Sequence, residues 1–119
     1  MKKFLAVYTG SADARRKSEW ETLPPAELQR RQAEGIQAWG NWMQAHKASI
    51  LDSGGPLGKT KRTGPEGVSD TRNNLAGYVI VQADSHQAAA DLFRNHPHFT
   101  LFPGDSVEVM ECLPVPGQS

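Results

Sequence analysis

The chain has few of the features that tie a protein to a membrane, a nucleic acid or an oxidising compartment. Its 13 basic and 13 acidic residues cancel to a formal net charge of zero. The overall charge therefore gives no electrostatic case for binding nucleic acid or an anionic membrane. The single cysteine, Cys112, excludes an internal disulfide and favours a reducing cytoplasm. No apolar run approaches the ~20 residues of a membrane span.

The N-terminal segment combines two lysines with apolar residues, as a signal peptide does. Its apolar run stops at Tyr8, which is short for a secretory core of roughly 7–15 apolar residues. A first strand over residues 3–9 is the better interpretation. A chain without net charge also has little self-repulsion, so association between copies is easy.

Hydrophobic periodicity and turn residues divide the 119 residues into the elements of one domain. We expect a first helix opened by Pro24 and Pro25, and a second helix over residues 85–95. Residues 10–24 and 58–74 are loop excursions, and the second contains a hairpin with arms near 58–62 and 68–71. The remaining expected segments are strands at 48–53, 75–83 and 107–113, a loop at 96–105 and a tail at 114–119.

The order of these elements is β-α-β-β-α-β, which predicts an α+β ferredoxin-like sandwich with a four-stranded antiparallel sheet and an extra hairpin. Two helices can cover only one face of such a sheet, yet apolar residues alternate onto both faces. A bare apolar face usually marks a partner, and a second copy is the simplest one. We therefore expect a homodimer through the sheet face. The alternative is that the excursion and the tail cover this face within one chain.

Several short motifs resemble those of the YCII-related family, which includes the DGPF group. They are Pro25-Ala26-Glu27-Leu28 at the first helix, Ser53-Gly54-Gly55-Pro56-Leu57 after the second strand, His96-Pro97, and Gly104 to Val109 before the last strand. The resemblance runs from Lys3 to Leu113 and implies a dimeric α+β barrel. It also implies a small-molecule enzyme built on a His–Asp pair. Glu27 stands where a relative shows the histidine.

Four residues are candidates for acid–base catalysis: His46, His98, Asp52 and Glu27. A histidine has an ordinary pKa near neutrality, so it can serve as a general base when a carboxylate orients it. Asp105 is a further carboxylate that could pair with His98. For His46, a purely structural role at the end of the first helix is the competing interpretation.

A second group of residues could bind a ligand: Tyr8, Tyr78, Trp39, His96, Asp105 and Arg72. The two tyrosines lie on strands expected to be neighbours, and interface packing is their alternative role. Of Trp39 and Trp42, one is expected in the core and the other at a pocket wall or interface. Arg72 belongs to a basic excursion that could receive an anion. A metal at His96 and His98 would need a third or fourth ligand, for which Asp105 or Glu108 is a candidate; a polar cap is the favoured role of His96, and we expect no metal and no cofactor.

Two functions from different classes remain open. The first is a cofactor-free small-molecule enzyme whose pocket lies near the dimer interface and holds a histidine hydrogen-bonded to a carboxylate. The second is a non-catalytic ligand-binding or regulatory dimer that passes a signal through the basic excursion. Both would bind a small organic molecule, and neither involves nucleic acid or a membrane.

Overall fold

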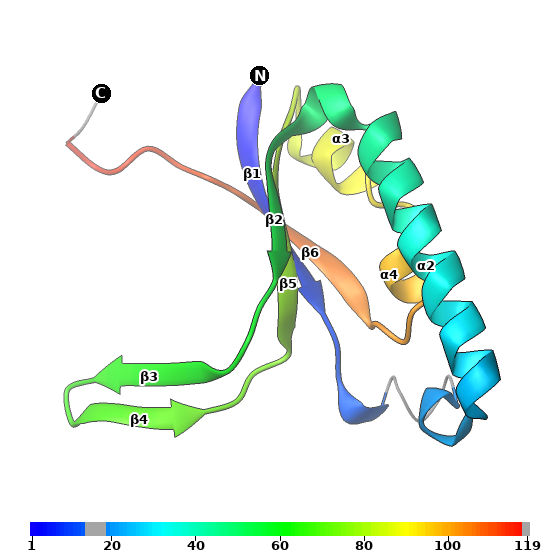
Figure 1. Ribbon diagram of the computed structural model, residues 1–119. Helices are drawn as coiled ribbons and strands as arrows, with labels where there is room; N and C mark the ends of the chain where they lie inside the picture. The colour runs from blue at the N-terminus through cyan, green and yellow to red at the C-terminus, as the bar shows by residue number, and fades with distance from the viewer. Residues whose placement is uncertain (14–18, 118–119) are drawn as a thin grey trace.

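In the computed structural model, which describes residues 1–13 and 19–117, the helices lie on one side of a four-stranded antiparallel sheet (Figure 1). The sheet contains β1 (Lys2–Thr9), β2 (Ile50–Pro56), β5 (Leu75–Ala83) and β6 (Ser106–Glu111), in the order β2-β5-β1-β6. Beside it are α2 (Pro25–Ala45), α3 (His86–Asp91), α4 (Pro97–Thr100) and the short 3₁₀ helices η1 (Trp20–Thr22) and η2 (Lys47–Ser49). A separate hairpin pairs β3 (Thr60–Gly64) with β4 (Gly67–Thr71). The predicted fold class is confirmed.

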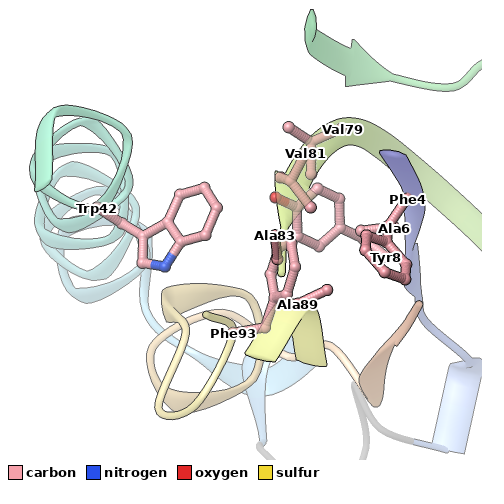
Figure 2. Close-up of a cluster of buried hydrophobic side chains, with 9 residues drawn as sticks. All are labelled: Phe4, Ala6, Tyr8, Trp42, Val79, Val81, Ala83, Ala89 and Phe93. Atoms are coloured by element: carbon pink, nitrogen blue, oxygen red, sulfur yellow. The ribbon is translucent and has the colours of Figure 1, made fainter. Parts of the chain in front are cut away.

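The core forms between the sheet and α2 and α3 (Figure 2). Alternation along β1 directs Phe4, Ala6 and Tyr8 toward the helices, and these residues are buried. The other residues of this core are Val79, Val81 and Ala83 of β5, Trp42 of α2, Ala89 of α3, and Phe93 just after α3. Trp42 also donates its indole N–H to the Leu92 carbonyl oxygen at 2.9 Å, which ties α2 to the segment after α3.

Helix α2 begins where the two prolines predict and ends at His46. Proline is favoured at the first helical position because its missing N–H is not needed there. Ile36 of α2 is an exposed apolar residue, with 68% of its surface accessible. The reason is that Ile36 borders an open cavity instead of packing on the sheet. Within the described residues, no helix is long and apolar enough to cross a bilayer.

The segment after α3 differs from the predicted loop. Helix α3 ends at Asp91, and the turn that follows it ends at Asn95, which adopts a left-handed backbone conformation with φ of 57°. His96 and Pro97 then start α4, with His96 as N-cap and proline in the first turn. His96 is therefore the N-cap of α4. The sequence had suggested instead that His96 closes the second helix.

The face of the sheet opposite the helices carries a row of apolar side chains. The register of β1 with its neighbours places Leu5, Val7, Tyr78, Ile80 and Met110 on this outer face. Met110 is 40% exposed. The β3–β4 hairpin extends away from the four-stranded sheet (Figure 1), so the hairpin does not cover this face.

Candidate functional site

A cavity of about 410 Å³ lies between α2, the ends of β1 and β2, the start of β5 and the loop after α4. Its volume falls in the range of roughly 300–1,000 Å³ that is typical of small-molecule sites. Most of its wall is apolar or aromatic, and the polar groups come from a few residues. The lining residues are Tyr8, Ile36, Trp39, Gly40, Ser53, Gly55, Pro56, Ala76, Gly77, Tyr78, His98 and Phe102.

Glycines create the space for the aromatic wall. Tyr8 faces Gly77 across the β1–β5 pair, and a Cβ on Gly77 would lie 3.3 Å from the Tyr8 ring. The Tyr8 ring then contacts Trp39 at a centroid distance of 4.8 Å. A Cβ on Gly35 would overlap the ring of Phe102, so this mid-helix glycine lets Phe102 pack directly on the backbone of α2.

His98 is fixed in the cavity wall by its contact with β1. Its Nε2 lies 2.6 Å from the Thr9 carbonyl oxygen. A carbonyl oxygen can only accept, so Nε2 carries the proton and Nδ1 keeps its lone pair in the neutral ring. No described residue hydrogen-bonds this Nδ1, and no buried polar side-chain atom in the described part of the chain is left unpaired. The Nδ1 atom therefore faces space that solvent reaches.

Electrostatics keep both histidines of this segment uncharged near neutral pH. Burial lowers the pKa of His98, while the hydrogen bond to Thr9 and the nearby carboxylate of Asp105 oppose this change. His96 is completely buried, and this burial lowers its pKa to about 3, helped by the proximity of His98 and His46. His96 lies directly behind the wall, with its ring 5.1 Å from that of Tyr8 and 4.6 Å from that of Trp39.

The structure brings Tyr8, Tyr78, Trp39 and His98 to one cavity, from two strands, α2 and α4. Tyr78 pairs with Val7 in the β1–β5 register, so strand alternation places its side chain on the outer face, opposite to Tyr8.

The other candidate residues do not line this cavity. His46 ends α2, with its ring 4.9 Å from Trp42. Asp52 is exposed on β2 and accepts a hydrogen bond from the Gly54 N–H at 2.8 Å. Glu27 forms ion pairs with arginines of the first turns of α2, which lower its pKa. Asp105 is exposed beside His98, and Arg72 borders a separate groove beside the hairpin.

The expected histidine–carboxylate pair is absent from the described residues. Among them, the salt bridges all join lysine or arginine to a carboxylate, and no three metal-ligating side chains form a cluster. The backbone carbonyl of Thr9 takes the orienting position that a carboxylate was expected to hold.

Two residues that support the site were not predicted. Phe102 lines the cavity. Gly104 leaves room for the His98 ring, because a Cβ on Gly104 would overlap that ring and the carbonyl oxygen of His98. The mid-helix Gly35 was the available signal for Phe102, because a glycine in a helix interior suggests close packing.

Comparison with known proteins supports the fold. No family model and no curated protein matches the sequence. A solved structure aligns over 98% of this chain and 99% of its own, with a TM-score of 0.54 and 19% sequence identity. It is the 5-chloro-2-hydroxyhydroquinone dehydrochlorinase (TftG) from Burkholderia phenoliruptrix AC1100, in complex with 2,5-dihydroxybenzoquinone.

The chain shares the fold of this neighbour, an α+β architecture with a four-stranded antiparallel sheet. At 19% identity the likeness extends to the fold, and it agrees with the architecture that the sequence predicted.

Proposed function

We propose that this dimeric α+β barrel protein is a cofactor-free enzyme of the YCII-related type. It catalyses proton transfer to or from a small, planar organic molecule that is bound in the cavity. The observation that carries the proposal is the state of His98: its Nε2–H is given to Thr9, and its unprotonated Nδ1 faces accessible space. A neutral imidazole of this kind is available as a general base near neutral pH.

The remaining groups suit the charge changes of such a reaction. The Nδ1 of His98 would take a proton from a C–H or O–H bond of the substrate, and the electron pair of that bond would move onto a conjugated oxygen. Tyr8 lines the same cavity, and its hydroxyl would stabilise that oxygen. The Thr9 carbonyl and the charge of Asp105 favour the protonated imidazole that results. Trp39 offers an aromatic surface for a flat substrate.

The solved neighbour supports a substrate of this size. Its name describes the removal of chloride from a hydroxylated aromatic ring, and it was solved with a dihydroxylated quinone. One such ring fits within a cavity of about 410 Å³. A hydroxylated ring is therefore the first class to test.

The proposal includes a homodimer through the outer face. Leu5, Ile80 and Met110 form a partly exposed apolar surface on the side of the sheet away from the helices, and the hairpin extends away from it (Figure 1). Covering such a surface is favourable by ~25 cal/mol per Å² before the costs of association. A cytoplasmic location remains part of the proposal on the basis of the single cysteine.

A non-catalytic ligand-binding dimer is the second candidate. One observation favours it: no carboxylate of the described residues hydrogen-bonds either histidine of the cavity region, whereas enzymes commonly orient a histidine base in that way. In this case the same cavity would bind a ligand and pass a signal.

The test is a thermal-shift screen with hydroxylated benzenes, quinones and cyclic hydroxyketones, followed by a spectrophotometric assay on each compound that binds. A ligand at 100 times its Kd should add ~2.7 kcal/mol to the free energy of unfolding. His98→Gln should lower turnover by ~10²–10⁴-fold while a bound compound still stabilises the protein. His46→Gln, outside the cavity, is the matched control. Binding without any conversion, in the wild type as in H98Q, would support the non-catalytic candidate.

A further inference from the structure

A chain of hydrogen bonds behind the cavity sets the proton positions of its polar groups. The backbone N–H of His98 donates to Nδ1 of His96 at 2.9 Å. A backbone N–H can only donate, so Nδ1 of His96 carries a lone pair. The ring is buried and uncharged, and its one proton must therefore be on Nε2. This Nε2 lies 3.4 Å from the hydroxyl oxygen of Tyr8.

The proton on His96 decides what the Tyr8 hydroxyl can do. Because Nε2–H points at the Tyr8 oxygen, that oxygen accepts from His96, and the proton of Tyr8 must point elsewhere. No described residue accepts this proton, while Tyr8 lines the cavity. Burial also raises the pKa of Tyr8, so the hydroxyl keeps its proton. The Tyr8 hydroxyl is thus left as a donor on a residue of the cavity wall.

His98 has the opposite character. Its Nε2–H is used by Thr9, so the Nδ1 that remains can only accept. The rings of Tyr8 and His98 lie 5.2 Å apart, centroid to centroid. One donor and one acceptor are therefore carried by two neighbouring rings in the wall of a mainly apolar cavity.

We propose that His96 is a positioning residue that fixes this polarity, and that the cavity selects ligands with an acceptor oxygen beside a hydroxyl, the α-hydroxycarbonyl or enol arrangement. The inference deepens the proposed function and rests on it for the identity of the cavity. A ligand of this class gives its carbonyl to Tyr8 and its hydroxyl to His98. A methyl ether of the same ring has no hydroxyl proton to donate to Nδ1 of His98. Its methyl group would also occupy the position from which a ligand reaches this nitrogen.

The proton positions can be measured without any ligand. Long-range ¹H–¹⁵N correlation spectra of the ¹⁵N-labelled protein near neutral pH distinguish the two neutral tautomers from the charged ring. We expect both His96 and His98 as neutral Nε2–H tautomers. His96 found charged, or protonated on Nδ1, would overturn the inference whatever the enzyme does.

Ligand selectivity is tested with a matched pair of probes, 3-hydroxy-2-methyl-4-pyranone and its 3-methoxy ether. The wild type should bind the hydroxy compound about five- to tenfold more tightly by calorimetry, the effect of about one hydrogen bond. Tyr8→Phe should weaken binding of both compounds. Equal affinity of the wild type for the two probes, or no binding of either, would show that the ligand class is wrong.

Two variants separate positioning by His96 from a structural role. His96→Asn retains an acceptor for the His98 N–H, as asparagine does at helix N-caps, but cannot reach Tyr8. His96→Gln can present an amide N–H to Tyr8. We expect H96N to bind both probes more weakly, as Tyr8→Phe does, and H96Q to bind both nearly as tightly as the wild type, with thermal unfolding confirming that both variants fold.

An equal loss of affinity in H96N and H96Q would reject positioning by His96, and turnover that still depends on His98 would leave the proposed function intact. Conversely, the expected tautomers and selectivity without turnover of any compound would retain the inference and reject the enzyme.

Discussion

Gly104 determines whether His98 can occupy its place in the cavity wall. A Cβ built on Gly104 would overlap Nε2 and Cε1 of the His98 ring and the His98 carbonyl oxygen. The Gly104 N–H also donates to that carbonyl at 3.0 Å, so the two residues cannot simply separate. Overpacking of this kind costs ~1–3 kcal/mol. Moving the ring from Thr9 adds ~1 kcal/mol for the hydrogen bond. Gly104→Ala should therefore lower the free energy of unfolding by about 2–4 kcal/mol.

The measurement is urea unfolding of Gly104→Ala beside a matched control. At Gly58 a Cβ would meet no atom within 4 Å, and Gly58 has no left-handed φ, so Gly58→Ala should stay within about 0.5 kcal/mol of the wild type. In Gly104→Ala the ¹⁵N signals of His98 should also change, because its Nε2–H loses Thr9. A Gly104→Ala protein as stable as the Gly58→Ala control would refute the placement of the His98 ring, and with it the role assigned to Nδ1.

Three further predictions concern packing, pH and assembly. Gly35→Ala should be about 1–3 kcal/mol less stable than Gly40→Ala by urea unfolding, because both gain helix propensity but only the first overlaps Phe102; equal stabilities would contradict that packing. The pKa of His96 is about 3 in the folded protein and ~6.5 in the unfolded chain. Its contribution to the free energy of unfolding is therefore complete above about pH 6.5 and falls by up to ~1.4 kcal/mol per pH unit below that pH. His96→Gln should show a smaller loss between pH 7 and 5, and an unchanged slope would contradict the buried neutral ring. By light scattering, the wild type should have twice the chain mass of 13.0 kDa and Ile80→Glu the mass of one chain, whereas a wild type of one chain mass would reject the dimer.

The fold followed from local signals that tertiary packing did not override. Pro24 and Pro25 placed the start of α2, and period-two alternation around Tyr8 and Tyr78 placed the central strands. The prediction was less accurate where one backbone angle decides the outcome. The break at Asn95, with its φ of 57°, leads into α4, and a sequence pattern gives little indication of it.

The site could be predicted only in part, because helix phase and strand alternation decide which candidates meet. Tyr8, Trp39 and His98 were candidates and line one cavity. His46 was equally plausible as a residue type, but the last turn of α2 directs its ring against Trp42. Asp52 lies opposite Ile80 of the outer face, next to a register shift in β2, and such an irregularity depends on pairing that no single strand reveals.

The dipeptide His96-Pro97 was interpreted as a helix boundary, and the structure shows why a boundary can have chemical consequences. Pro97 has no N–H, so the first N–H that the His96 side chain can cap is that of His98. That cap uses Nδ1 of His96, which moves the proton of the ring to Nε2 and toward Tyr8. The hydrogen bond that starts α4 is therefore the same one that makes Tyr8 a donor in the cavity. A change that disrupts the start of α4 should weaken ligand binding through Tyr8 even where it leaves the cavity wall untouched.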